Sequence, residues 1–150
     1  MVSGGYGPEV LARIRALSEA DPGRETCGFV VRRGGALEVV PVPNVADRYH
    51  AADPAAYPRT SRDSYLMEPR ALLGALEAID AGGGELVAVW HSHVEVGAYF
   101  SAKDRADALI GAAQALPGAE YLVAGLRGGR VTELRRFRYQ DGDFREEELS

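Results

Sequence analysis

The sequence contains one cysteine, no uncharged apolar run of membrane-spanning length and no excess of basic residues. Because Cys27 has no second cysteine to pair with, nothing points to a disulfide-bonded protein of an oxidising compartment. No apolar run approaches the roughly 20 residues that a transmembrane helix needs. The 17 basic and 22 acidic residues leave a net charge of −5, which argues against a dedicated binder of nucleic acid or of an anionic membrane.

Residues 1–8 have neither the basic segment nor the apolar region of a secretory signal peptide, so we expect a soluble protein of the cytoplasm. The 46% of apolar and 26% of charged residues are ordinary for a globular protein. A chain of this length should bury roughly two-thirds of its unfolded surface, which is enough for one core. The sequence shows no repeat and no internal boundary, so we expect a single domain over residues 1–150.

Apolar residues at helical spacing predict three helices. Pro8 stands where the first would begin, at a position where its missing N–H group costs nothing. The third would begin at Ser101 and carry Leu109 and Ile110 on its apolar face. It would end before Pro117, because proline followed by glycine breaks a helix. The three predicted helices cover residues 8–20, 69–81 and 101–116.

Six further segments have the composition of strands, and glycine pairs between some of them suit hairpin turns. Residues 86–90 are almost wholly apolar, which is typical of a central strand buried on both faces. Residues 43–64 lack a clear period and predict a long loop of the kind that often carries function. The pattern predicts an α+β fold, with a mixed, largely antiparallel sheet flanked by about three helices. The predicted strands cover residues 27–32, 37–42, 86–90, 121–126, 131–139 and 144–149.

Two of the three histidines, His91 and His93, lie two positions apart at the end of the predicted strand 86–90. Alternate residues of a strand point to the same face, so both imidazoles should project together. Two imidazoles are two of the three protein ligands that a catalytic zinc site needs. Asp104, in the first turn of the next predicted helix, is placed to bend back as the third ligand, and Ser101 lies one turn earlier.

The order of these residues is a second observation. His91 and His93 are followed, after seven residues, by Ser101 and then, after two more, by Asp104, with Glu25 far upstream. This pattern resembles the signature of the JAMM (MPN/Mov34-type) zinc metallopeptidases, and the short chain looks like their stand-alone bacterial members.

The resemblance covers about residues 7–140 and includes the order of helices and strands. It implies an MPN/JAB-like fold, a deaminase-like α-β-α sandwich. The sequence departs from the family at Val94, where proline is usual, and at Phe100, where many members have proline or leucine. Both positions shape the rim of the site, so they bear on substrate specificity more than on metal binding.

The resemblance also implies a role for each residue. His91, His93 and Asp104 would hold one zinc ion per chain, Glu25 would act as the general base, and Ser101 would stabilise the oxyanion. The implied reaction is hydrolysis of a peptide or isopeptide bond in a protein or peptide substrate. The implied substrate in bacteria is a small ubiquitin-like sulfur-carrier protein with a Gly-Gly tail.

Two other functions remain open. One is a peptidase that acts on cell-wall or phage-tail peptides, and the other is a non-catalytic MPN-type scaffold that binds proteins. Relatives of the second kind usually lack the metal ligands, whereas His91, His93 and Asp104 are all present here. The two histidines could also be surface or capping residues that bind no metal.

The single residues have plainer interpretations as well. Ser101 and Asp104 fit a capping box, which does not exclude a metal ligand, because an aspartate in the first turn can also face a metal. Asp107, one turn further, is a substitute third ligand. We expect Cys27 to be a buried, small apolar residue rather than a nucleophile, and His50 to be a solvated loop residue.

Overall fold

The computed structural model describes residues 5–110 and 113–149 and is built on a six-stranded sheet. The strands lie in the order β2-β1-β3-β6-β7-β8. Within the described sheet, β3 and β6 run parallel, and all the remaining neighbouring strands run antiparallel to each other. This confirms the predicted mixed, largely antiparallel sheet. The strands are β1 (Cys27–Arg33), β2 (Ala36–Val42), β3 (Glu85–Val94), β6 (Glu120–Arg127), β7 (Arg130–Gln140) and β8 (Asp143–Glu148).

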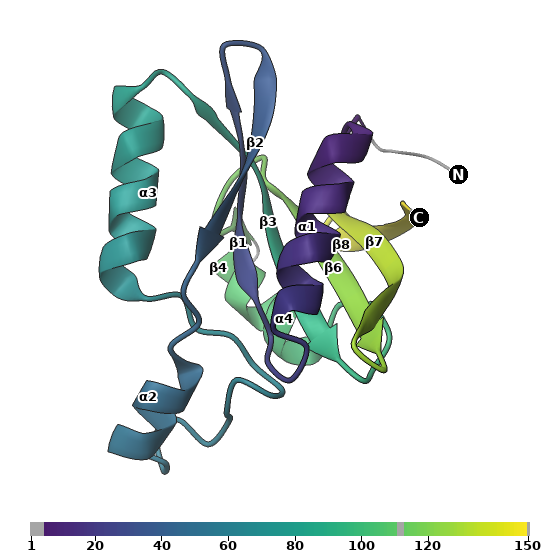
Figure 1. Cartoon of the computed structure of the whole chain (residues 1–150). Coiled ribbons are helices and arrows are strands. Elements are labelled where there is room, and N and C mark those ends of the chain that lie inside the picture. The colour runs from purple at the N-terminus through teal and green to yellow at the C-terminus, as the bar shows by residue number, and fades with distance from the viewer. Residues whose placement is uncertain (1–4, 111–112, 150) are drawn as a thin grey trace.

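Helices cover both faces of this sheet (Figure 1), as the predicted α-β-α sandwich requires. On one face, Val10 and Ile14 lie in a core cluster with Trp90. On the other face, Ile79 and Ala108 belong to a second core cluster. No helix in the described part of the chain is long and apolar enough to cross a bilayer. The helices are α1 (Pro8–Ala20), α2 (Ala46–Ala52), α3 (Pro69–Ala81) and α4 (Ala102–Ala108).

The predicted starts of the first two long helices are confirmed. Pro8 and Pro69 each occupy the first turn, where a missing N–H group leaves no hydrogen bond unmade. Glu68 caps α3, because its carboxylate accepts a hydrogen bond from the amide of Ala71 at 2.7 Å. Apolar periodicity therefore located α1 and α3 correctly.

The predicted third helix is too long. It ends at Ala108, and the next residue, Leu109, already has extended backbone angles of φ −120° and ψ 147°. The chain then forms a small antiparallel pair of strands, β4 (Leu109–Ile110) and β5 (Ala113–Gln114). Leucine and isoleucine suit a strand as well as a helix, so their spacing alone did not mark this end.

Residues 43–64 were predicted as a loop, but they include α2. The Asn44 side chain accepts a hydrogen bond from the amide of Ala46, which stabilises the start of this helix. The strand predicted over 86–90 also continues further, because β3 pairs with β6 as far as Val94. The two histidines therefore lie within the central strand and not after its end.

Candidate active site

The central strand β3 carries the imidazoles of His91 and His93 to the same side of the sheet. Both residues are paired with β6, His91 opposite Val123 and His93 opposite Gly125. Their Nε2 atoms are 3.1 Å apart, and both side chains are buried. The predicted convergence of the two imidazoles is therefore present in the structure.

The Asp104 carboxylate reaches the two imidazoles from the start of α4. Its Oδ2 atom lies 3.2 Å from Nε2 of His91 and 3.3 Å from Nε2 of His93. The same oxygen accepts a hydrogen bond from the Ser101 amide at 3.0 Å, while Ser101 Oγ accepts one from the Asp104 amide at 3.0 Å. The predicted capping box and the predicted cluster thus exist together, and the cap holds the carboxylate towards the histidines.

The three donor atoms of His91, His93 and Asp104 form a triangle with edges of 3.1, 3.2 and 3.3 Å. Ligand atoms about 2.0 Å from a tetrahedral zinc ion lie about 3.3 Å from one another. Two imidazole nitrogens and one carboxylate oxygen are also donors that zinc accepts. The triangle therefore fits one face of a zinc coordination shell.

Hydrogen bonds and burial prepare the imidazoles for this task. Nδ1 of His93 lies 2.9 Å from the Gly97 carbonyl oxygen, which can only accept, so Nδ1 carries the proton and Nε2 keeps its lone pair. The ring of His91 stacks on Tyr65, with centroids 4.6 Å apart. Burial lowers the pKa of His91, which favours the neutral imidazole that metals bind.

The charge of Asp104 is stabilised where it lies. Burial acts to raise the pKa of this carboxyl group, but the imidazoles of His91 and His93 and the Ser101 amide outweigh it. They hold the pKa of Asp104 well below its usual range. The residue therefore presents a carboxylate, the form that binds a cation.

Glu25 is the remaining acidic residue of the cluster, and it is buried. Donor atoms of Glu25, His91 and His93 all lie within 4.8 Å of one another, so this group could also hold a metal ion. Burial raises the pKa of Glu25 to about 8; the nearby Asp104 adds to this, while His93 acts in the opposite direction. A carboxyl group with such a pKa can both accept and release a proton near neutral pH.

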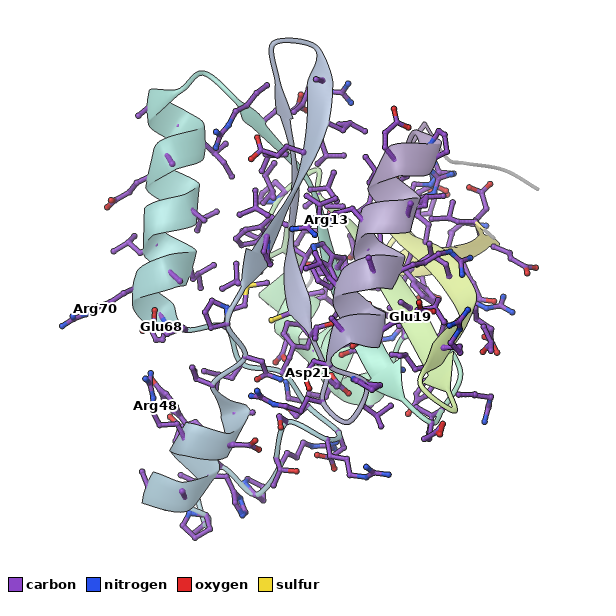
Figure 2. All side chains as sticks on the ribbon, viewed as in Figure 1. Arg13, Glu19, Asp21, Arg48, Glu68 and Arg70 are labelled. Carbon is purple, nitrogen blue, oxygen red and sulfur yellow. The ribbon has the colours of Figure 1, made fainter. Side chains whose placement is uncertain are left out.

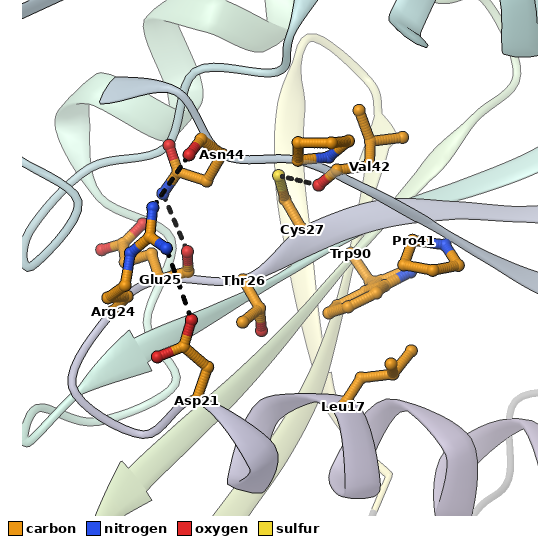
Figure 3. Close-up of a pocket in the computed structure, with 11 residues that line it drawn as sticks. Leu17, Asp21, Arg24, Glu25, Thr26, Cys27, Pro41, Val42, Asn44 and Trp90 are labelled. Atoms are coloured by element: carbon orange, nitrogen blue, oxygen red, sulfur yellow. Dashed lines mark hydrogen bonds and ion pairs between the residues drawn. The ribbon is translucent and has the colours of Figure 1, made fainter. Parts of the chain in front are cut away.

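The backbone of Glu25 is fixed by the segment between β2 and α3. Its amide donates to the Ser61 carbonyl oxygen at 2.6 Å, and its own carbonyl oxygen accepts from Nδ2 of Asn44 at 2.8 Å (Figure 3). Asn44 also donates to the Ser64 carbonyl oxygen and accepts from the Leu66 amide, each at 3.0 Å. This one side chain therefore ties Glu25 to the segment on both sides of α2.

A cavity of about 270 Å³ opens onto this cluster. Glu25, His93, Ser101 and Asp104 contribute to its wall. A second cavity of about 370 Å³ lies behind Glu25 (Figure 3), but its wall contains neither histidine nor Asp104. We therefore take the smaller cavity as the cleft of the candidate site and call it the active-site cleft. Its other lining residues are Arg59, Arg62, Asp63, Ser64, Val94, Val96, Tyr99 and Lys103.

The structure separates the remaining candidates from the site. Asp107, the substitute ligand, is exposed and lies 2.6 Å from the Lys103 ammonium group instead. Cys27 is buried as predicted, and its thiol donates to a backbone carbonyl oxygen. His50 was predicted in a loop; it lies in α2, half-buried, and does not line the active-site cleft.

Sequence reasoning missed Asn44, Ser61 and Tyr65. All three belong to the region between β2 and α3, where no periodic pattern guided the prediction. Their contacts join residues about 20 to 40 positions apart, such as Asn44 to Glu25 and Ser61 to Glu25. The one local signal was an asparagine near the start of α2, because asparagine side chains often accept a hydrogen bond from a backbone amide two residues further on, as Asn44 does from Ala46.

The fold and the cluster define an α+β domain in which two histidines of the central strand β3 meet the carboxylates of Glu25, which precedes β1, and Asp104, which lies in α4. Comparison with known sequences makes the class specific: the chain belongs to the family described as prokaryotic homologs of the JAB domain, which matches residues 7–140. This confirms the resemblance seen in the sequence.

Individual relatives agree with this assignment. The chain is 32% identical over 126 residues to a desampylase of Haloferax volcanii, an alignment that covers 82% of this chain and 77% of the relative. Two solution structures have a similar fold. A protein from Desulfitobacterium hafniense has a TM-score of 0.66 at 22% identity, covering 94% of this chain and 87% of that one. A protein from Salinibacter ruber has a TM-score of 0.59 at 21% identity, covering 94% and 86%.

Proposed function

We propose that this protein is a zinc-dependent peptidase or isopeptidase that cleaves at the C-terminal Gly-Gly tail of a small ubiquitin-like or sulfur-carrier protein. The observation that carries the proposal is the triangle of donor atoms from His91, His93 and Asp104 with edges of 3.1 to 3.3 Å. Membership of the JAB family and the likeness to a desampylase support the choice of reaction and of substrate.

In this proposal, His91, His93 and Asp104 hold the zinc ion. A bound zinc ion supplies Lewis acidity, which polarises a carbonyl group and lowers the pKa of water to about 7. Asp104 is the third ligand rather than Glu25, because its Oδ2 atom lies within 3.3 Å of both imidazole nitrogens. This leaves the Glu25 carboxylate unligated.

Glu25 is the general base. Its carboxylate accepts a proton from the attacking water and then transfers it to the leaving amine, as a positioned carboxylate with a pKa of about 8 can do. Its place in the wall of the active-site cleft gives it access to both. Its backbone hydrogen bonds to Ser61 and Asn44 fix the point from which the side chain extends.

Ser101 stabilises the oxyanion that forms when water attacks the carbonyl carbon. Its Oγ atom accepts a hydrogen bond from the Asp104 amide through one lone pair, and its hydroxyl hydrogen is left to donate into the cleft. One donor of this kind contributes about 3–4 kcal/mol to lowering the barrier.

The test combines metal analysis with a cleavage assay. The purified protein should contain about one zinc ion per chain and should cleave a Gly-Gly-tailed ubiquitin-like protein from the lysine side chain to which it is attached. Glu25→Gln should retain the zinc and lose the cleavage. Loss of zinc from this variant would show that Glu25 is a ligand, and zinc binding without cleavage in the wild-type protein would favour the scaffold function.

A further inference from the structure

Two arginines on the rim of the active-site cleft have no partner in the described part of the protein. Arg59 and Arg62 both line the cleft, and both are exposed. Within residues 5–110 and 113–149, neither guanidinium group makes an ion pair or a hydrogen bond. Several arginines elsewhere in the described part of the chain are paired; Arg135, for example, lies 2.8 Å from the Glu146 carboxylate. Unpartnered cations beside a catalytic cleft, in a chain of net charge −5, point to a ligand.

The other charges of the rim do not cancel the two arginines. Lys103 is already paired, since its ammonium group lies 2.6 Å from Asp107 and over the ring of Tyr65. Asp63 is the one acidic residue on the rim, because Glu25 and Asp104 belong to the buried cluster. The carboxylate of Asp63 accepts a hydrogen bond from the Thr60 amide. The rim therefore has an excess of positive charge that Arg59 and Arg62 supply.

The backbone that carries these arginines is fixed beside the general base. Ser61 stands between them and is buried. Its amide and its hydroxyl group both donate to the Asp47 carboxylate at 2.7 Å, and its carbonyl oxygen accepts the Glu25 amide at 2.6 Å. A cation on a fixed backbone loses less conformational freedom on binding a ligand than one on a loose loop.

Arg59 also faces the space next to the cleft. It lines a neighbouring cavity of about 440 Å³, whose wall is largely apolar and includes Tyr57, Tyr65 and Leu66. Lys103 lines both cavities as well. An extended peptide that leaves the active-site cleft towards this apolar cavity therefore passes directly over Arg59.

We propose that Arg59 and Arg62 bind carboxylate side chains of the protein substrate, so that the preferred substrate carries an acidic segment directly before its Gly-Gly tail. This inference rests on the proposed function, since it names the substrate class of the same site. Guanidinium groups recognise carboxylates in a bidentate manner, and charges at a rim act on encounter and selection more than on the chemical step. The arginines are specificity residues that do not take part in the reaction.

The test uses two internally quenched peptides with amidated C-termini. One has three glutamates directly before a central Gly-Gly pair, and the other has three glutamines there. The wild-type enzyme should cleave the glutamate peptide with a kcat/KM about tenfold higher, and this preference should shrink as salt is added. The double variant Arg59→Gln/Arg62→Gln should lose the preference, because its kcat/KM for the glutamate peptide falls to the level of the glutamine peptide.

A matched control comes from Arg70, which is exposed, does not line the active-site cleft and points away from the molecule at the start of α3 (Figure 2). Arg70→Gln removes the same charge outside the cleft and should keep the preference. The charge reversal Arg59→Glu/Arg62→Glu should favour a peptide with three lysines. Equal cleavage of both peptides by the wild-type enzyme, or an equal loss on both in the double variant, would overturn the inference.

Binding measurements separate this inference from the proposed function. Fluorescence anisotropy with the cleavage-deficient Glu25→Gln protein should give a Kd about tenfold lower for the glutamate peptide, and this difference should depend on Arg59 and Arg62. If the glutamate peptide binds in this way but the wild-type protein cleaves neither peptide, the proposed hydrolysis fails, while recognition of carboxylates by Arg59 and Arg62 stands. If a free C-terminal carboxylate is needed for the preference, the inference about side chains is wrong.

Discussion

The central strand β3 and the segment of residues 43–68 meet at the candidate site, but different interactions hold them in place. In β3, the register with β1 and β6 and the burial of its apolar residues fix His91 and His93. In the segment 43–68, a few polar side chains make the decisive contacts, above all Asn44. The comparison shows that the sheet places the two imidazoles of the candidate site, whereas a hydrogen-bonded segment fixes the backbone of Glu25 and carries Arg59 and Arg62.

The largest effect should follow from removing the carboxylate of α4 that completes the donor triangle with the two imidazoles of β3. We expect Asp104→Ala to abolish zinc binding and to lower cleavage by about 1,000-fold or more, since the remaining imidazoles hold the ion too weakly. Asp107→Ala is the matched control, because Asp107 is exposed and lies one turn further along α4. Metal analysis and initial rates check both variants. Stoichiometric zinc in Asp104→Ala would assign the third ligand to another residue.

A large loss of stability should follow from crowding β1. A Cβ atom on Gly28 would lie 2.2 Å from the Val40 carbonyl oxygen and 2.8 Å from Nε1 of Trp90. Because Val40 belongs to the paired strand β2, its oxygen cannot move without breaking the sheet. We expect Gly28→Ala to reduce the free energy of unfolding by about 3 kcal/mol or more.

A second glycine provides the control for this prediction. Gly74 lies in α3 and is exposed, and a Cβ atom added there would meet nothing within 4 Å. Gly74→Ala should therefore raise the free energy of unfolding by about 0.5–1 kcal/mol, because alanine favours a helix. Urea titrations of both variants measure the two effects. Similar changes in the two would show that the strand tolerates crowding.

The buried carboxyl group of Glu25 should destabilise the metal-free protein at high pH. The pKa of Glu25 is about 8 in the folded protein and lower in the unfolded chain. At a pH between the two pKa values, the folded state keeps a proton on this group that the unfolded state has lost, so the folded state loses stability as the pH rises. Glu25→Gln removes this loss. In chelator-treated protein, the variant should gain about 4 kcal/mol over wild type at pH 8 and almost nothing at pH 4. An equal gain at both pH values would contradict the assigned cause.

A smaller effect should follow from loosening the polar segment. Asn44→Ala removes the hydrogen bonds to the carbonyl oxygens of Glu25 and Ser64, and we expect it to cost about 2 kcal/mol of stability. Cleavage should fall by about tenfold while the zinc content stays unchanged, because no donor atom is lost. Asp53→Ala, in the same segment but exposed and without contact to Glu25, should keep the full rate. Loss of zinc in Asn44→Ala would show that the segment supports the metal donors too.

The parts of the molecule with a repeating pattern could be predicted from the sequence. The period of two along the central strand brought His91 and His93 to one face, and the helical period located α1 and α3. The convergence of Glu25 with these histidines was inferred from the family resemblance alone. Its place beside them depends on β1 pairing with β3, which no local pattern encodes.

The parts held by long-range polar contacts could not be predicted. Asn44 was not recognised because its partners, Glu25 and Ser64, are distant in the sequence and no spacing links them. The end of α4 was placed too late because Leu109 and Ile110 continue an apolar pattern into a strand. In both regions tertiary contacts decide the local structure.

One oxygen atom of Asp104 takes part both in the N-terminal cap of α4 and in the donor triangle, which couples cation binding to the stability of the helix. Oδ2 of this residue accepts the Ser101 amide hydrogen and also faces both imidazoles, so the first turn of α4 and the donor triangle form as one unit. By thermodynamic linkage, an ion that binds the triangle also stabilises that turn against fraying. Amide hydrogen exchange at the beginning of α4 would then report the occupancy of a centre whose two imidazoles lie on β3.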